Sequence, residues 1–198
     1  MDSRERSRRR FLINSALGMT ASAGLLHPLG AVLGAAPQRY GILGQTAPAI
    51  QSEHWIDRDG KAAQFSMTEL EGRWVYLKCF QNWCPGCHKF GFPALKKVAD
   101  AFEEDDRIAV LAIQTVFEGH HFNTRESVRE LQLRYDLPIK MGHDPGDPDT
   151  DGLPKTMRDY RTGGTPWVVI INPEGIVVFN DYHIDADQFI RRVSTELA

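Results

Sequence analysis

Two cysteines three residues apart are the part of this sequence best suited to chemistry. Cys84 and Cys87 enclose a Pro-Gly pair and follow Trp83. The mainly apolar residues 74–80 before them predict a strand, so the pair is expected where a helix starts after a strand. At that position the first thiol meets the positive end of the helix and ionises readily, and the second is close enough to form a disulfide with it. The spacing therefore predicts thiol–disulfide exchange.

Two other kinds of site share this spacing. A structural zinc site needs a second pair of ligands, and the sequence shows none with suitable spacing. A c-type haem attachment site has the form C-x-x-C-H, which His88 completes. Such a site belongs to a mostly helical protein with a second axial ligand. The strand predicted before Cys84 favours disulfide exchange over both alternatives.

The rest of the chain predicts alternating strands and helices that would position this pair. Hydrophobic periodicity and turn residues indicate a hairpin near the start and another near the end of the domain. The expected strands cover residues 55–56, 62–65, 74–80, 108–117, 137–141, 167–171 and 176–179. The expected helices cover residues 84–104, with a kink at Pro93, then 124–135, 154–160 and 185–197. This order predicts an α/β fold with a central mixed sheet flanked by helices.

Three separated features make residues 50–198 resemble the thioredoxin fold, in the TlpA-like exported form that carries an N-terminal β-hairpin. The first is the run Trp83-Cys84-Pro85-Gly86-Cys87 after a strand. The second is Gly164-Thr165-Pro166 before a strand, and the third is the terminal hairpin followed by a helix. Together they are far more specific than a C-x-x-C pair alone.

The resemblance implies a function and a role for each site residue. It makes Cys84 the attacking thiolate and Cys87 the resolving thiol of a thiol–disulfide oxidoreductase, which we expect to act as a reductase. It implies protein dithiol or disulfide substrates, a membrane redox carrier as electron partner, and no diffusible cofactor. It also implies a cis peptide bond before the proline that faces the cysteine pair. The residues expected to form the substrate-docking surface are Trp83, Pro85, Thr165 and Pro166.

Lys78 departs from the family pattern. Thioredoxins have a buried acid at the matching position, whereas this chain has a base. One hypothesis is that Lys78 lies beneath the cysteines, stabilises the thiolate and makes the pair more oxidising. The alternative is a lysine that reaches solvent or pairs with Glu118. The neighbouring Cys79 should point to the other face of the strand as a buried, inert thiol.

Two further functions remain open for a chain of this fold. A thiol peroxidase of the peroxiredoxin type would have a threonine three residues before the attacking cysteine, where Gln81 stands, and an activating arginine, for which Arg161 is a candidate. A copper-delivery protein would use two thiolates and a histidine such as His143. Its cysteines are normally spaced one residue wider than Cys84 and Cys87.

The N-terminus resembles a bacterial twin-arginine export signal. Paired arginines precede Phe11 and Leu12, and a mildly apolar segment rich in Ala, Gly and Leu follows. We therefore expect residues 1–36 to be the export signal, residues 37–52 a linker and residues 53–198 the thioredoxin-like domain. The expected location is the periplasm, with a membrane tether if the signal is not cleaved.

Charge and the remaining motifs add no further function. The formal net charge is −3 and no basic run follows the signal, so no nucleic acid partner is expected. Residues 144–152 contain D-x-D-x-D-G, the opening of a calcium loop, but Arg158 stands where the bidentate acid belongs. We expect a solvated surface loop there and no metal site.

Overall fold

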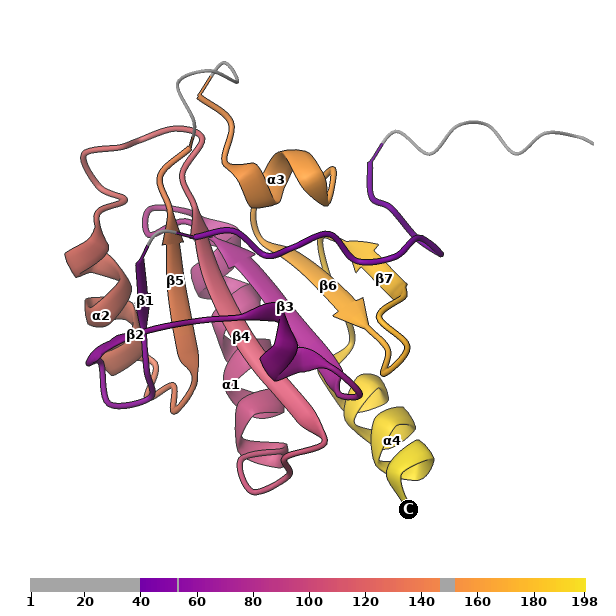
Figure 1. The fold of residues 1–198 in the computed structure, drawn as a ribbon. Helices are drawn as coiled ribbons and strands as arrows, with labels where there is room; N and C mark the ends of the chain where they lie inside the picture. Colours follow the sequence, from indigo (N-terminus) through magenta and orange to yellow (C-terminus); the bar gives the residue numbers. More distant parts are fainter. Residues whose placement is uncertain (1–39, 53, 147–151) are drawn as a thin grey trace, which may run out of the picture. The chain divides into compact units, whose positions relative to one another are not determined.

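A computed structural model describes residues 40–52, 54–146 and 152–198, which form a seven-stranded mixed sheet with helices on its faces (Figure 1). The strand order is β2-β1-β5-β4-β3-β6-β7. This confirms the predicted α/β class, the mixed sheet and the N-terminal hairpin. The predicted export signal lies outside the described residues, and so do three aspartates of the acidic loop: Asp147, Asp149 and Asp151.

The strands and helices follow one another in the predicted order. The strands are β1 (His54–Ile56), β2 (Ala62–Ala63), β3 (Trp74–Phe80), β4 (Ile108–Thr115), β5 (Lys140–Asp144), β6 (Trp167–Ile171) and β7 (Val177–Asp181). The helices are the 3₁₀ helix η1 (Met67–Leu70), the π-helical turn η2 (Cys87–Gly91), α1 (Phe92–Ala101), α2 (Arg125–Arg134), α3 (Lys155–Asp159) and α4 (Ala186–Leu197). Strands β3, β4 and β5 run parallel, and β1, β2, β6 and β7 are antiparallel to their neighbours. Among the described residues, no helix is long and apolar enough to cross a membrane.

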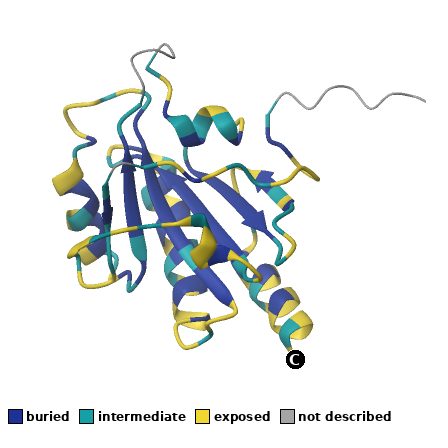
Figure 2. Cartoon of the chain, viewed as in Figure 1, coloured by how far each residue is buried: buried dark blue, intermediate teal, exposed yellow. Residues whose placement is uncertain are grey.

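Strand β3 lies inside the sheet, between β4 and β6, and contributes side chains to two hydrophobic cores, one on each face. Successive side chains of a strand point to opposite faces. Tyr76 and Phe80 therefore belong to the core covered by α1, α2 and α4, whereas Leu77 and Cys79 belong to the core covered by η1, α3 and the segment before β1. The buried colouring of the central strands in Figure 2 follows from this two-sided cover.

Residues 40–52, within the segment predicted as a linker, pack on the domain. Ile42 and Ile50 are buried in the second core, and Thr46 forms an isolated β-bridge with Ile176. Their apolar side chains are too few and too widely spaced to give a strand or helix pattern.

Strand β5 begins three residues later than predicted. Leu137 and Ile139 are buried, which gave the apolar signal, but they precede the strand. The strand itself continues into His143 and Asp144, which are buried because hydrogen bonds satisfy them. Polar residues that are buried in this way do not contribute to an apolar pattern, so the strand predicted from that pattern ends before the observed one.

The helix after the cysteines is interrupted where Pro93 predicted a kink. Cys87–Gly91 form a π-helical turn, in which the Phe92 amide donates to the Cys87 carbonyl. Pro93 then lies in the first turn of α1, where its missing N–H leaves no helical hydrogen bond unmade. This wider turn begins at Cys87, the second cysteine of the pair. Such π turns are frequent at functional sites.

Candidate active site

Cys84 and Cys87 lie together at the end of β3, where the helix begins. The Cys84 amide donates to the Gln81 carbonyl at 3.3 Å, which closes the turn between strand and helix. Cys84 is 5% exposed and Cys87 is fully buried. The Cys87 amide donates to Cys84 Sγ at 3.1 Å, and both residues are free thiols. Cys84 thus keeps a small exposed area, whereas Cys87 has none.

The surroundings of the two sulfurs separate their acidities. Hydrogen bonds from the Cys87 thiol, the Thr165 side chain and the Cys87 and Gly86 amides lower the pKa of Cys84 to about 6, against the opposing effect of burial. Burial, and then the hydrogen bond with Cys84, raise the pKa of Cys87 above its ordinary value. Near neutral pH, Cys84 is thus a thiolate and Cys87 a thiol, which are the states that attack and resolution require.

The loop before β6 faces the cysteine pair. The Thr165–Pro166 peptide bond is cis. A Cβ placed on Gly86 would lie 3.1 Å from Pro166 Cδ, so the proline ring lies directly against the middle of the C-x-x-C turn. Gly86 has a helical φ of −65°, which any residue can adopt. A glycine is needed at this position because a side chain would crowd Pro166. The structure thus brings together Cys84, Thr165 and Pro166 from segments 80 residues apart, as the resemblance implied.

Trp83 is 44% exposed and is held by the buried side-chain amide of Gln81. Its Nε1–H donates to Gln81 Oε1 at 2.6 Å, and Gln81 Nε2 donates to the Thr115 carbonyl at 3.0 Å. The indole ring also lies over Gly119, where a Cβ would come within 2.9 Å of Nε1. Gln81 therefore positions the tryptophan. The sequence indicated only that Gln81 stands where a peroxiredoxin has a threonine.

His88 uses both ring nitrogens within the protein. Nδ1 is hydrogen-bonded to the Tyr135 hydroxyl at 2.6 Å, and Nε2 to the Asn82 carbonyl. Because a carbonyl only accepts, Nε2 carries the proton and Nδ1 accepts from the tyrosine. Both nitrogens are therefore engaged within the protein, and the C-x-x-C-H run here belongs to an α/β fold.

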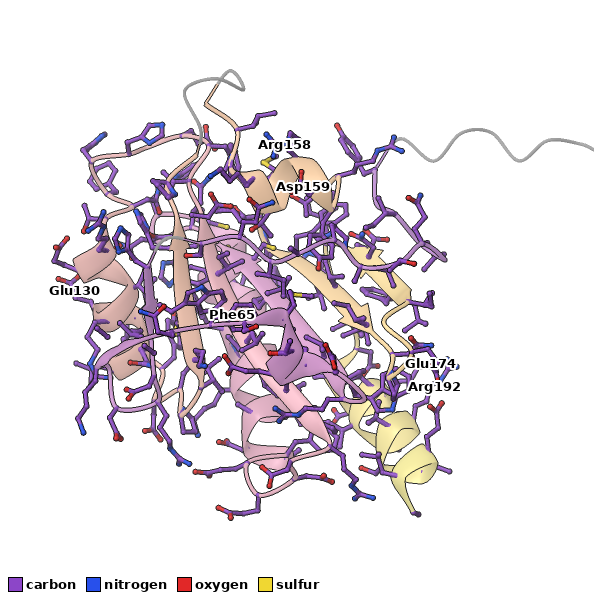
Figure 3. All side chains as sticks on the ribbon, in the orientation of Figure 1. Phe65, Glu130, Arg158, Asp159, Glu174 and Arg192 are labelled. Carbon is purple, nitrogen blue, oxygen red and sulfur yellow. The ribbon has the colours of Figure 1, made fainter. Side chains whose placement is uncertain are left out.

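Lys78 is buried, and the alternative in which it reaches solvent is wrong. Its side chain is 2% exposed, in contrast to ionised residues such as Arg158, Asp159 and Arg192 at the surface (Figure 3). Within the described part of the chain, Lys78 forms no ion pair with Glu118 or any other acid. Burial lowers the pKa of Lys78 to about 8, and the charges of the three cysteines act in the opposite direction.

Gly91 leaves the room that Lys78 occupies behind the cysteines. A Cβ on Gly91 would lie 3.0 Å from Lys78 Cε, 3.2 Å from Lys78 Nζ and 3.2 Å from Pro166 Cβ. Its φ of −66° is ordinary for any residue in a helix, so the glycine is needed for space. The lysine head group therefore lies between the π-helical turn and the cis-proline loop. Gly91 was not among the residues predicted from the sequence, and a glycine one helical turn after Cys87 is the signal from which this close approach could have been predicted.

The third thiol lies on the other face of β3 from Tyr76 and Phe80. Cys79 is buried in the opposite core, as expected, and burial raises its pKa to about 12. His143 Nδ1 is bonded to Gln114 Oε1 at 2.7 Å in the sheet, and Arg161 is exposed. Across residues 40–52, 54–146 and 152–198, no group of three or more His, Cys, Asp or Glu side chains is arranged to hold a metal ion.

This geometry defines a thioredoxin-like protein with a dithiol centre, and comparison with known proteins gives the family. Residues 43–180 match the AhpC/TSA family, and the chain belongs to that family of redoxins. No curated protein sequence shows a significant match.

Solved structures agree with the fold. A thioredoxin-like superfamily protein is 29% identical, with a TM-score of 0.66 over 76% of this chain and 94% of that chain. A thiol-disulfide isomerase from Corynebacterium glutamicum is 22% identical, with a TM-score of 0.64 over 75% of this chain and 95% of its own. A secreted disulfide oxidoreductase from Mycobacterium tuberculosis is 20% identical, with a TM-score of 0.51 over 73% of this chain and 96% of its own. The fold is therefore thioredoxin-like, and its structural neighbours include thiol–disulfide oxidoreductases.

Proposed function

We propose that this protein is an exported thiol–disulfide oxidoreductase of the TlpA-like type that reduces protein disulfides through Cys84 and Cys87. The observation that carries the proposal is the difference between the two thiols. Cys84 has a lowered pKa at a helix start beside Thr165, and Cys87 is a buried thiol within hydrogen-bonding distance of it. A reductase needs one ionised sulfur that attacks and one protonated sulfur that waits.

The reaction proceeds in two exchange steps. The Cys84 thiolate attacks one sulfur of a substrate disulfide, the substrate S–S bond breaks, and one substrate sulfur leaves as a thiolate while a mixed disulfide forms. Cys87 then loses its proton and attacks Cys84 Sγ, which releases the second substrate thiolate. The substrate gains two electrons, its two thiolates take up protons, and the enzyme is left with a Cys84–Cys87 disulfide.

The substrate would dock as an extended segment on the surface around Cys84. Trp83 supplies an exposed aromatic face, and Pro85, Thr165 and Pro166 border the reactive sulfur. The cycle needs no diffusible cofactor. An external dithiol must return the electrons, and a membrane redox carrier is the partner that fits an exported enzyme.

The export part of the proposal rests on the twin-arginine pattern at residues 7–12. It gives the protein a periplasmic location, where disulfides persist. A double Arg8→Lys, Arg9→Lys variant should remain in the cytoplasmic fraction, and unchanged export of this variant would contradict the assignment.

Lys78 would tune the redox potential. A buried ammonium near both sulfurs stabilises the thiolate of the reduced form more than the neutral disulfide, which makes the pair more oxidising. Replacing Lys78 with methionine should therefore make the measured potential more negative, by about 30 mV for each 1.4 kcal/mol of thiolate stabilisation that is lost. An unchanged potential would remove Lys78 from this role.

Trapping experiments test the proposed exchange directly. A Cys87→Ala variant cannot resolve the mixed disulfide, so Cys84 should stay covalently bound to its substrates in the periplasm. The matched control is the Cys84→Ala variant, which should capture nothing. If Cys87→Ala captures no protein and Cys84 is dispensable for disulfide exchange in vitro, the proposal fails.

Membership of the AhpC/TSA family supports a thiol peroxidase as the second candidate. In that reaction the Cys84 thiolate attacks a hydroperoxide oxygen, the O–O bond breaks to release water or an alcohol, and Cys87 condenses with the resulting sulfenic acid to form a disulfide and water. The buried Gln81 at the position of the peroxidase threonine speaks against this activity. Turnover of hydrogen peroxide or cumene hydroperoxide, compared with the rate of insulin disulfide reduction, distinguishes the two functions.

A further inference from the structure

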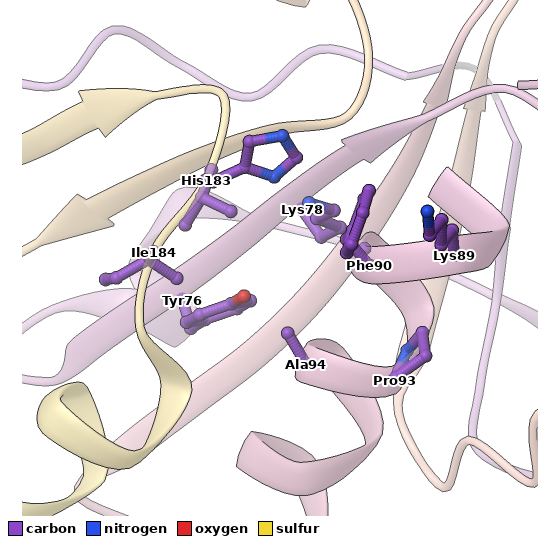
Figure 4. Close-up of a pocket in the computed structure, with 10 residues that line it drawn as sticks. Tyr76, Lys78, Lys89, Phe90, Pro93, Ala94, His183 and Ile184 are labelled. Atoms are coloured by element: carbon purple, nitrogen blue, oxygen red, sulfur yellow. The ribbon is translucent and has the colours of Figure 1, made fainter. Parts of the chain in front are cut away.

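A cavity of about 420 Å³ opens behind the active-site helix, next to Lys78 (Figure 4). Tyr76, Lys78 and Val168 from β3 and β6 form its floor. The π-helical turn and the start of α1 form one wall, and the loop between β7 and α4 forms the other. This volume lies within the range of pockets that hold small organic molecules, about 300–1,000 Å³.

Two largely buried polar side chains, Tyr76 and Lys78, line this cavity without a hydrogen-bond partner among the described residues. The Tyr76 hydroxyl is fully buried and has no hydrogen-bond partner among the described residues. Burial raises the pKa of Tyr76, so this hydroxyl keeps its proton and is available as a hydrogen-bond donor. Lys78, two residues along the same face of β3, forms neither a hydrogen bond nor an ion pair with any described residue. A buried donor or charge that stays unpaired is costly, and native structures normally satisfy it.

The lining determines what kind of acceptor fits. None of the ten residues around the cavity is acidic, and Lys89 and His183 add basic groups at the rim. Most of the other lining side chains are apolar, among them Phe90, Pro93 and Ile184. One cation and one hydroxyl side by side match the two oxygens of a carboxylate, and the apolar walls match a hydrocarbon body.

We infer that this cavity is a carboxylate-binding subsite, in which Lys78 and Tyr76 hold the carboxylate of a small aliphatic acid or of an acidic side chain. The carboxylate would accept one hydrogen bond from the Tyr76 hydroxyl and charge-assisted hydrogen bonds from the Lys78 ammonium. Its aliphatic part would lie against Phe90, Pro93 and Ile184. The subsite does not depend on disulfide exchange, because neither cysteine lines it.

Calorimetric titration of the reduced full-length protein tests the subsite. Butyrate should bind saturably, whereas its neutral isostere butyramide should not. Lys78→Met and Tyr76→Phe should each weaken butyrate binding by about tenfold or more, because each removes a hydrogen bond to a charged group. The matched control is Lys97→Met, which removes an exposed lysine of α1 that pairs with Asp187 outside the cavity and should leave the affinity unchanged.

Two further comparisons complete the experiment. Blocked tripeptides with a central glutamate or glutamine distinguish a free acid from an acidic side chain as the source of the carboxylate. Tyr76→Phe removes only the hydroxyl and keeps the ring in place, so it tests the role of the cavity in butyrate binding even if Lys78→Met fails to fold. Absence of saturable binding by both butyrate and the glutamate peptide, equal binding of butyramide, or affinity unchanged in Tyr76→Phe would overturn the inference. Failure of disulfide exchange would leave these binding results unaffected.

Discussion

The hydroxyl of Thr165 should set part of the acidity of Cys84, and Thr165→Val removes it with little change in shape. A hydrogen bond to a charged acceptor is worth about 1.5–3 kcal/mol, and we use the lower end because Thr165 is half-buried. About 1.4 kcal/mol corresponds to one pKa unit, so the pKa of Cys84 should rise from about 6 to about 7. At pH 7 the thiolate fraction would then fall from about nine-tenths to about one half.

Thiolate absorbance near 240 nm of the reduced protein measures this change. The titration should contain one step below pH 9, because Cys79 has a pKa of about 12 and that of Cys87 is also raised. Thr165→Ser keeps the hydroxyl and is the matched control, with an unchanged midpoint. A Cys84 midpoint that does not move in Thr165→Val, or that moves equally in Thr165→Ser, would refute the assigned hydrogen bond.

Two further predictions concern stability. Lys78→Met should raise the free energy of unfolding near neutral pH by about 2 kcal/mol, because it removes a buried cation that pairs with no carboxylate among the described residues. A lower urea midpoint would contradict this. The reduced protein should gain stability as the pH rises from about 6 to about 9, because the pKa of Cys84 is lowered from 9.0 in the unfolded chain to about 6 in the folded protein. That contribution is present above the unfolded pKa and is lost as the pH falls through the folded one, so Cys84→Ser should flatten this part of the profile. Urea unfolding of the reduced protein across this range measures the slope, and equal slopes in the two proteins would disprove the assignment.

Local patterns were sufficient to predict most of the fold. The boundaries of β3 and of β6 agree with the sequence because both strands are apolar runs bounded by polar or turn residues. The start of α2 agrees because Thr124 caps it through its side chain. The end of β5 could not be predicted in the same way. Its last residues are polar, and they are buried because of hydrogen bonds that only the folded sheet provides.

The site was predictable in its reactive residues and less so in its surroundings. Cys84 and Cys87 are three residues apart in the sequence, and Thr165-Pro166 was found through the family resemblance. The burial of Lys78 depends on packing: Gly91 leaves the space, and no acid in the described part of the chain forms an ion pair with it. Tyr76 gave no signal, because a tyrosine in an apolar strand is an ordinary core residue unless the structure shows that its hydroxyl lacks a partner among the residues it describes.

Mapping the thiols after equilibration in glutathione redox buffers tests the central claim most directly. Acid quenching, alkylation and mass spectrometry would show which sulfurs are oxidised at each potential. We expect one two-electron transition in which Cys84 and Cys87 form a disulfide while Cys79 remains a thiol. A disulfide that includes Cys79, or no reversible Cys84–Cys87 disulfide at any potential, would contradict this account.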